Sequence, residues 1–263
     1  MLGGAAGAKP PPVRAAIPGV PLVKQETDNG CTEASTAAVL GFHGRHVGFW
    51  DVKRSVRAFR DGTTFFHVAP YVETTFGKGP NGLATLTFRA DEDALQRLIA
   101  ARLPTVVRVT SSHGLHALVL IGYDRGRGEA RVIDPANGTA QTLPRAELAQ
   151  RRAEADDLVF LIFPRQRLDR LGALGLPLQR IEAQDRRYRA MGTELLAAEH
   201  TGETRQRCDL LAQAEAIDPS YRRVVEALVR CLEAMNDDDA LAASRAAKRR
   251  LDAMGPGQDP FTP

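Results

Sequence analysis

The stretch Gln25-Glu-Thr-Asp-Asn-Gly-Cys31-Thr-Glu-Ala-Ser-Thr-Ala-Ala-Val-Leu40 decides how the rest of the chain is interpreted. A glutamine and a run of turn-forming residues precede a cysteine that opens a helical pattern of small residues. The positive end of a helix dipole favours a thiolate, and a fixed glutamine amide can donate to an oxyanion. The stretch therefore predicts a nucleophile at Cys31 and an oxyanion donor at Gln25. The alternative is a buried cysteine that only begins a core helix.

Size and charge limit the class of protein. The chain has 263 residues, 43% of them apolar, which suffices for one large domain or two modest ones. Its 35 basic residues nearly balance 32 acidic ones, so a nucleic acid partner is not expected. No segment has the roughly 18 apolar residues of a membrane span. The first residues lack the basic start and apolar run of a signal peptide, and the compartment, cytoplasmic or exported, stays open.

The cysteines and histidines predict neither a disulfide framework nor a metal site. Besides Cys31 there are only Cys208 and Cys231, and no Cys-x-x-Cys pair occurs. We predict that these two are thiols in the core of C-terminal helices, with a bridge between adjacent helices as the less favoured alternative. Most histidines lack Cys or carboxylate neighbours at ligand spacing, so no metal ion or other cofactor is expected.

Changes in pattern divide the chain into five parts. They are a flexible Gly/Ala/Pro-rich lead-in (1–17), an α+β domain (18–164), a linker with one short helix (165–180), a helical region (181–256) and a tail (257–263). The α+β prediction rests on order, because the helical patterns of the second part come first and most of its strand patterns follow. The lead-in contains Gly3-Gly4, which composition alone explains.

The segment Ala214-Glu-Ala-Ile-Asp-Pro219-Ser-Tyr221 and the helical patterns after it resemble the tetratricopeptide repeat. In that repeat, small residues mark helix crossings and a proline ends the second helix. Pro219 and Pro256 are 37 positions apart, against about 34 in the repeat. The resemblance implies a region that binds a protein partner. A plain helical tail is the alternative.

A predicted hairpin supplies two further candidate residues. His116 begins an apolar strand, and Asp134 ends the strand that returns from a loop near Gly126. Antiparallel pairing sets position 116 opposite 134 or 136, so the two side chains lie within about 8 Å of each other. The pattern predicts a base, His116, oriented by Asp134. The alternatives are an ordinary hydrogen-bonded histidine and a turn-starting Asp-Pro. His113 is the rival base but lies in a polar loop.

These four residues together predict nucleophilic catalysis. Cys31 would attack a carbonyl carbon, and His116 would accept the thiol proton and later protonate the leaving amine. Asp134 would orient His116, and Gln25 with the Cys31 backbone N–H would bind the oxyanion.

The sequence resembles the bacteriocin-processing, or double-glycine, cysteine peptidase family. The resemblance rests on Val20-Pro-Leu-Val-Lys-Gln25 with Cys31, His116-Ala-Leu-Val-Leu-Ile-Gly-Tyr-Asp124 and Val132-Ile-Asp-Pro-Ala-Asn-Gly138, and covers roughly residues 18–164. It implies a papain-like fold, with Gln25, Cys31, His116 and Asp134 in the catalytic places of the family. It also implies a soluble, standalone bacterial peptidase that acts on peptides or proteins, such as leader or precursor peptides.

Two residues depart from the family pattern. Relatives usually have glycine after the cysteine, whereas Thr32 and Glu33 follow Cys31 here. A side chain at Thr32 narrows the site, and the charge of Glu33 opposes thiolate formation. Two alternatives therefore stay open: a catalytically silent peptide-binding module on the same fold, and an acyltransferase that uses the same cysteine.

Overall fold

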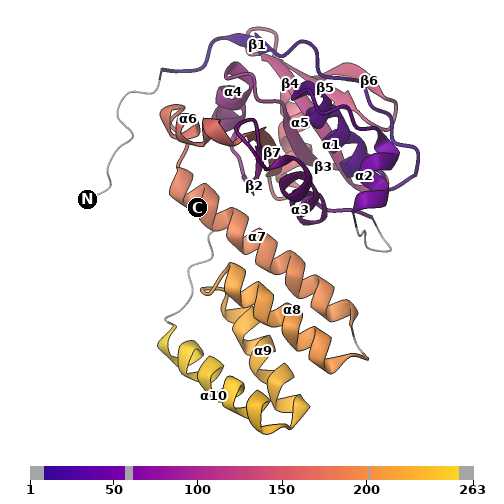
Figure 1. The fold of residues 1–263 in the computed structure, drawn as a ribbon. Coiled ribbons are helices and arrows are strands. Elements are labelled where there is room, and N and C mark those ends of the chain that lie inside the picture. Colours follow the sequence, from indigo (N-terminus) through magenta and orange to yellow (C-terminus); the bar gives the residue numbers. More distant parts are fainter. Residues whose placement is uncertain (1–8, 57–61, 201, 255–263) are drawn as a thin grey trace. The chain divides into compact units, whose positions relative to one another are not determined.

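The computed structural model describes residues 9–56, 62–200 and 202–254. The chain divides into two compact units, one that ends at Ile181 and one that begins at Glu182 (Figure 1). The predictions that concern Gly3-Gly4, Pro256 and the tail over 257–263 lie outside the described residues.

The first unit is built on an antiparallel sheet in the order β2-β7-β3-β4-β5-β6, with β1 beside the second half of β4. Its strands are β1 (Arg14–Ala16), β2 (Leu83–Arg89), β3 (Thr105–Ser111), β4 (Gly114–Asp124), β5 (Glu129–Asp134), β6 (Thr139–Pro144) and β7 (Leu158–Pro164). The sheet therefore carries His116 on β4 and Asp134 on β5.

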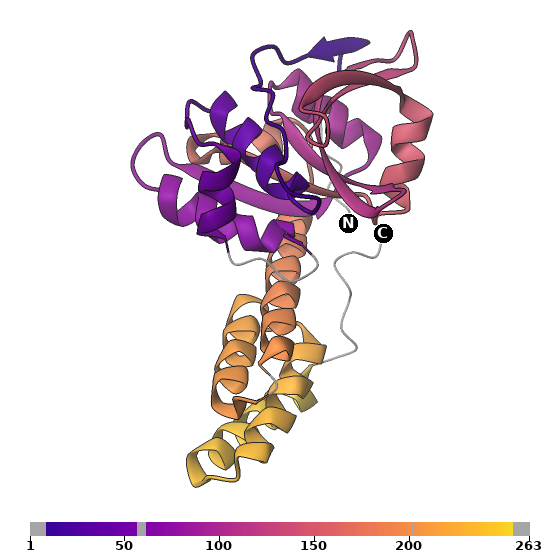
Figure 2. The same cartoon turned by 90° about the vertical axis from the view of Figure 1, so that its right-hand side faces the viewer.

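Helices cover both faces of this sheet. They are α1 (Cys31–Phe42), α2 (Phe49–Ser55), α3 (Phe65–Phe76), α4 (Glu92–Ala100) and α5 (Arg145–Ala153), followed by the short η1 (Arg165–Arg167) and α6 (Leu168–Ala173). The first three helices gather on one side of the sheet, and α5 lies on the other (Figures 1 and 2). The α+β prediction, with a cysteine-bearing helix packed against an antiparallel sheet, is confirmed.

Small residues let α1 pack closely. Ala34, Ala37 and Ala38 are buried, and α1 contacts β3 and β4. A Cβ atom at Gly41 would lie 2.8 Å from Pro21. On the other face of the sheet, Leu118 and similar buried side chains pack against α4, and each contributes about 1.5–3 kcal/mol relative to exposure.

A one-residue bulge changes the pairing of β4 with β5. Near the hairpin loop Gly122 pairs with Arg131, but the next pair is Leu120 with Val132, so Ile121 is the extra residue on β4. Continuing the shifted pairing sets His116 diagonal to Asp134 on one face. Without the bulge, these residues would point to opposite faces, because a shift of one residue turns every side chain over.

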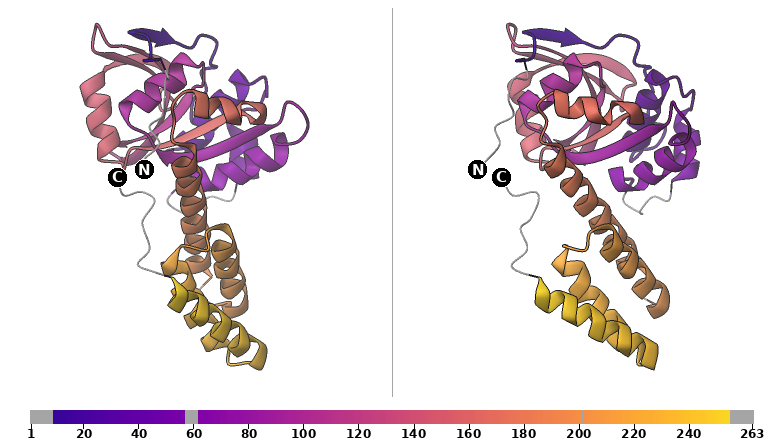
Figure 3. Two further views of the ribbon diagram at one scale, coloured as in Figure 1. Left: turned by 90° about the vertical axis from the view of Figure 1, so that its left-hand side faces the viewer. Right: turned by 60° about the vertical axis from the view of Figure 1, so that its left-hand side comes forward.

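The N-terminal strand holds this bulge in place. The Ile17 N–H donates to the carbonyl oxygen of the extra residue, Ile121, at 2.8 Å. The Tyr123 hydroxyl donates to the Pro12 carbonyl at 3.0 Å, and β1 lies beside the sheet (Figure 3). The flexible lead-in expected over 1–17 is thus corrected for its described part, because backbone pairing fixes it to β4.

The expected linker over 165–180 is also corrected. This segment contains η1, α6 and the start of α7, and its Leu171 and Leu176 are buried in the core of the first unit. The burial of these apolar side chains makes the segment part of the packed unit instead of a free connection.

The second unit contains helices only among its described residues, as predicted. It consists of α7 (Leu178–Glu199) from Glu182 onward, α8 (Thr204–Ile217), α9 (Arg222–Met235) and α10 (Asp238–Ala253). Pro219 follows the end of α8, and the buried Asp218 accepts hydrogen bonds from Arg187 and from the Ser220 backbone. The resemblance to the tetratricopeptide repeat stays a prediction.

Cys208 on α8 and Cys231 on α9 form a disulfide, with Cα atoms 5.6 Å apart. The prediction of two core thiols is therefore wrong, although both residues are buried. The two cysteines face each other where α8 packs on α9, which separate helical patterns do not reveal. In the described part of the chain, no helix combines the length and apolar character that a membrane crossing requires.

Candidate active site

The thiol of Cys31 lies at the first residue of α1 and is partly buried. The preceding Gly30 fits because it lacks a side chain: a Cβ atom there would lie 2.6 Å from the Phe49 ring and 2.8 Å from Thr27 Oγ1. Backbone N–H groups in the first turn of a helix have no partner within the helix. Cys31 is the one free cysteine among the residues described.

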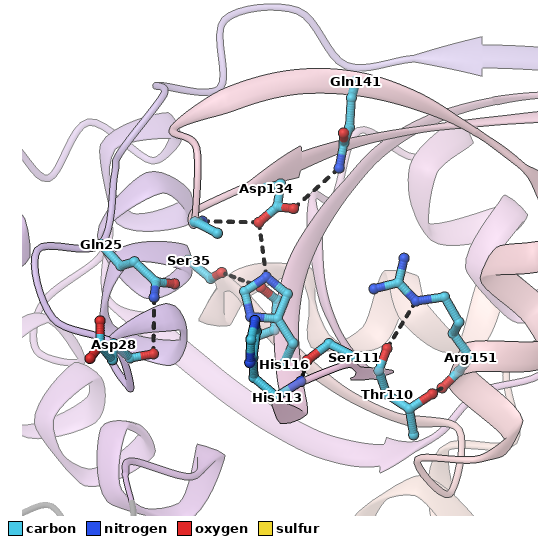
Figure 4. A network of polar contacts seen from close by, with 12 residues as sticks. Gln25, Asp28, Ser35, Thr110, Ser111, His113, His116, Asp134, Gln141 and Arg151 are labelled. Atoms are coloured by element: carbon cyan, nitrogen blue, oxygen red, sulfur yellow. Dashed lines mark hydrogen bonds and ion pairs between the residues drawn. The ribbon is translucent and has the colours of Figure 1, made fainter.

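His116 and Asp134 are in direct contact. His116 Nε2 lies 2.8 Å from Asp134 Oδ1, and the two side chains are only 13% and 17% exposed (Figure 4). The Ala136 N–H donates to the same carboxylate oxygen at 2.9 Å, and Gln141 Nε2 donates to Asp134 Oδ2 at 3.2 Å. Three donors therefore fix the orientation of Asp134.

Gln141 is a site residue that the sequence patterns do not predict. It lies on β6 opposite Val132, which places it on the same face as Asp134. The alternation of faces along β6 is a signal for this position, but it becomes usable only when the pairing with β5 is known.

The contacts of His116 raise its pKa. Burial is the largest influence and lowers the pKa, because it disfavours the imidazolium ion. Hydrogen bonds to Cys31 and Asp134, together with the electrostatic influence of these two groups, outweigh burial, so the pKa of His116 lies above its ordinary value of 6.5. The thiol, the imidazole and the carboxylate thus form a continuous chain of polar contacts.

A further contact joins the two elements that carry this chain. Ser35 on α1 donates from its hydroxyl to the carbonyl oxygen of Ala117, the neighbour of His116 on β4, at 3.4 Å. Ser35 is buried, so this bond helps to set the position of α1 relative to β4. No sequence pattern marks Ser35 for this contact.

Gln25 lies next to the turn that follows Asp134, since the Gln25 N–H donates to the Pro135 carbonyl at 2.8 Å. Its side-chain Nε2 donates to the carbonyl oxygen of Asp28 at 3.1 Å (Figure 4) and to that of Thr27, also at 3.1 Å. Its Oε1 is buried and has no hydrogen-bond partner among the described residues. The side-chain amide therefore stabilises its own turn. One of its two hydrogen bonds must break before the amide can donate to an oxyanion.

The two residues after Cys31 are engaged inside the unit. Thr32 Oγ1 donates to the Thr63 carbonyl at 2.9 Å, and both Thr32 and Glu33 are buried. Glu33 Oε1 accepts hydrogen bonds from Lys53 Nζ at 2.7 Å and from Thr63 Oγ1 at 2.6 Å. The ammonium group of Lys53 therefore offsets the negative charge that would otherwise oppose a thiolate at Cys31.

The other histidines differ from His116 in environment. His113 is exposed in the turn before β4, where its backbone N–H donates to Ser111 Oγ. Burial lowers the pKa of His43, and it lowers that of His67 to about 4 against the raising effect of Glu33. Among the described residues, no group of three or more His, Cys, Asp or Glu side chains is placed to hold a metal ion.

The part of the chain that carries this site is similar to a known protein family. The family model described as the Peptidase_C39 like family matches residues 17–155. A search among curated proteins gives no match.

The solved structures that are similar to this chain include the following three. One is described as that of a C39-like peptidase from Bacillus anthracis, with 18% identity, a TM-score of 0.47, and coverage of 58% of this chain and 98% of that chain. A double glycine motif protease from an AMS/PCAT transporter, in complex with the leader peptide, has 20% identity, a TM-score of 0.44, and coverage of 57% and 98%. The peptidase domain of Streptococcus ComA, a bi-functional ABC transporter, has 17% identity, a TM-score of 0.46, and coverage of 56% and 100%.

Proposed function

Since this chain belongs to the Peptidase_C39-like family, we propose that it is a cysteine peptidase that hydrolyses peptide bonds with Cys31 as nucleophile. The observation that carries the proposal is the chain of contacts from Cys31 through His116 to Asp134. Such a chain supplies a nucleophile, a base and a group that orients the base.

The first half of the reaction forms an acyl enzyme. His116 takes the Cys31 proton, and the sulfur attacks the carbonyl carbon of the scissile peptide bond. When the tetrahedral intermediate collapses, the C–N bond breaks and the imidazolium of His116 protonates the leaving amine. The raised pKa of His116 supports this role, because it favours the imidazolium that must form.

The second half releases the product. A water molecule loses a proton to His116 and attacks the thioester carbonyl, and the carboxylic acid leaves as Cys31 regains its proton. Asp134 keeps one ring nitrogen of His116 engaged throughout, which leaves the other ring nitrogen for proton exchange with Cys31.

The oxyanion of both intermediates needs hydrogen-bond donors. The Cys31 backbone N–H, in the first turn of α1, is one candidate donor. Gln25 is the second, and it becomes a donor when its amide exchanges a bond to the Thr27-Asp28 turn for one to the substrate. Leader or precursor peptides are the proposed substrates, on the strength of the family resemblance.

Replacement of Cys31 by alanine tests the proposal. Cys31→Ala should abolish both peptide hydrolysis and covalent labelling by a thiol-directed probe. The matched control is Cys208→Ala with Cys231→Ala, which removes the disulfide of the second unit and should leave labelling at Cys31 intact. Undiminished turnover by Cys31→Ala would contradict the proposal.

A silent peptide-binding module is the second candidate, because the Gln25 amide is bonded to its own turn. In that case a peptide binds, but the thiol probe fails to label Cys31 at neutral pH. Product analysis in the presence of an added amine separates hydrolysis from acyl transfer, since only an acyltransferase would give the amide product in place of the acid.

A further inference from the structure

The second unit contains a groove of about 430 Å³. Its floor is formed by Leu228, Leu232 and Met235 of α9, which follow one another at helical spacing. Its walls come from α8 and α10, the helices that pack on α9 (Figure 1). Small residues such as Ala212 and Ala243 line the walls and leave Leu232 and Met235 partly exposed, whereas Leu228 is buried beneath them.

Ion pairs connect the two walls at both ends of the groove. Arg250 on α10 binds both carboxylate oxygens of Glu215 on α8, at 2.7 and 2.8 Å. At the other end, Arg205 on α8 lies 3.6 Å from Asp237, the residue before α10. The disulfide at Cys208 also fixes one wall to the floor. The groove is therefore braced in the absence of an occupant, which reduces the ordering cost of binding.

These pairs leave the groove with an excess of negative charge. Its four carboxylates face only two guanidinium groups, those of Arg205 and Arg250, and each of these is engaged as described. Asp209 on α8 and Asp239 on α10 are exposed at the groove. Within the described part of the chain, neither has an ion-pair partner.

We propose that this groove binds a peptide segment that presents apolar side chains to the α9 floor and a lysine or arginine to Asp209 and Asp239. The apolar floor supplies burial, and the two carboxylates supply complementary charge and selectivity for a basic segment. Residues 255–263 of the chain itself contain no lysine or arginine and one aspartate, so their charge does not fit. This binding site shares no residue with the proposed peptidase site.

A labelled helix-forming peptide of leucine and lysine tests the proposal by fluorescence anisotropy. The protein is the full chain with Cys31→Ala, so that hydrolysis does not consume the probe. We expect saturable binding that weakens as salt is added. The same peptide with glutamate in place of lysine should bind at least about tenfold more weakly, because it meets like charge.

Two changes in the groove separate charge from shape. Asp209→Asn with Asp239→Asn should weaken binding of the lysine peptide by about tenfold, since two exposed ion pairs are lost. Ala243→Trp should abolish binding, because the indole fills the groove. Asp252→Asn is the matched control: it removes an exposed carboxylate of α10 outside the groove and should leave affinity unchanged.

Several results would overturn the proposal. Equal affinity for the lysine and glutamate peptides would exclude charge selection. Binding that survives Ala243→Trp, in a variant with unchanged circular dichroism, would place the peptide elsewhere. Light scattering that shows a dimer lost in Ala243→Trp, without peptide binding to the monomer, would make a second copy of the chain the occupant.

Discussion

The candidate active site has a half on the sheet and a half at the start of α1. The two halves differ in whether their polar side chains are hydrogen-bonded to other residues of the site. On the sheet, His116 and Asp134 are bonded directly, and Gln141 and the Ala136 N–H hold the carboxylate. On the helix side, the Cys31 thiol contacts His116, but the Gln25 amide donates to carbonyl groups of its own turn. The sheet residues are therefore already arranged for their proposed role, whereas the side chain of Gln25 must rearrange.

The difference follows from what positions each group. The backbone pairing of β4, β5 and β6 sets the sheet residues, and this pairing leaves few alternatives. Gln25 depends on the rotamer of one flexible side chain, and two nearby carbonyl groups compete with a substrate for its protons. The sheet half should therefore tolerate substitution poorly, and the helix half should respond to the substrate.

Loss of His116 should lower turnover more than loss of Gln25 or Gln141. His116→Ala removes the proposed base and acid, so kcat should fall by about 10²–10⁴-fold. The matched control is His113→Ala, which removes an exposed histidine from the adjacent turn and should leave kcat near that of the unaltered chain. A larger loss in His113→Ala would transfer the role of base to that residue.

Gln25→Ala tests the helix half. Loss of one oxyanion donor should lower kcat by about 10²–10³-fold. Alkylation of Cys31 by iodoacetamide forms no oxyanion, so its rate should change little. If Gln25 only braces the turn, the alkylation rate and the thermal midpoint should fall together with kcat, and the oxyanion role would be wrong.

Gln141→Leu should have a smaller effect. It removes one hydrogen bond to the Asp134 carboxylate, worth about 1.5 kcal/mol, which corresponds to a loss of roughly tenfold in kcat. Thr142→Val is the control, because it alters the neighbouring residue on the opposite face of β6. Equal effects of both substitutions would show that the loss of kcat comes from disturbance of β6 and not from loss of the Gln141–Asp134 hydrogen bond.

The smallest change is expected in the pH profile of kcat/KM. Its alkaline limb should move in the Gln141→Glu variant, while its maximum value stays the same. In the proposed mechanism the imidazolium of His116 accompanies the thiolate, so kcat/KM should fall on the alkaline side as His116 loses its proton above its raised pKa. The Gln141→Glu variant adds a carboxylate near Asp134 and should move this alkaline limb to higher pH. Movement to lower pH would show that another group governs the limb.

Much of the fold follows from local patterns in the sequence. The apolar strands, the helix that begins at Cys31 and the hairpin of β4 and β5 each have a clear period or turn signal. The hairpin loop also indicates that His116 and Asp134 are neighbours, because pairing distance depends mainly on the position of the loop.

The remaining features depend on information that is not local. Ile121 resembles the other apolar residues of β4, so nothing in the sequence marks it as the bulged residue. Residues 14–16 form a strand because Gly122 and its neighbours offer a free edge, despite the Pro- and Ala-rich composition around them. The bonds of Gln25 and the Cys208–Cys231 disulfide depend on a rotamer and on helix packing, respectively.

The bulge at Ile121 also determines where the chain can change in length. It lies between the site and the hairpin loop, and the pairing of Asp124 with Glu129 closes the loop side independently. Insertions among residues 125–128 should therefore leave His116 and Asp134 on one face, which makes this loop suitable for a reporter or an affinity tag. A single inserted residue between His116 and Ile121 would turn the imidazole to the opposite side of the sheet, so tolerance to insertion should fall sharply within a few positions of the loop.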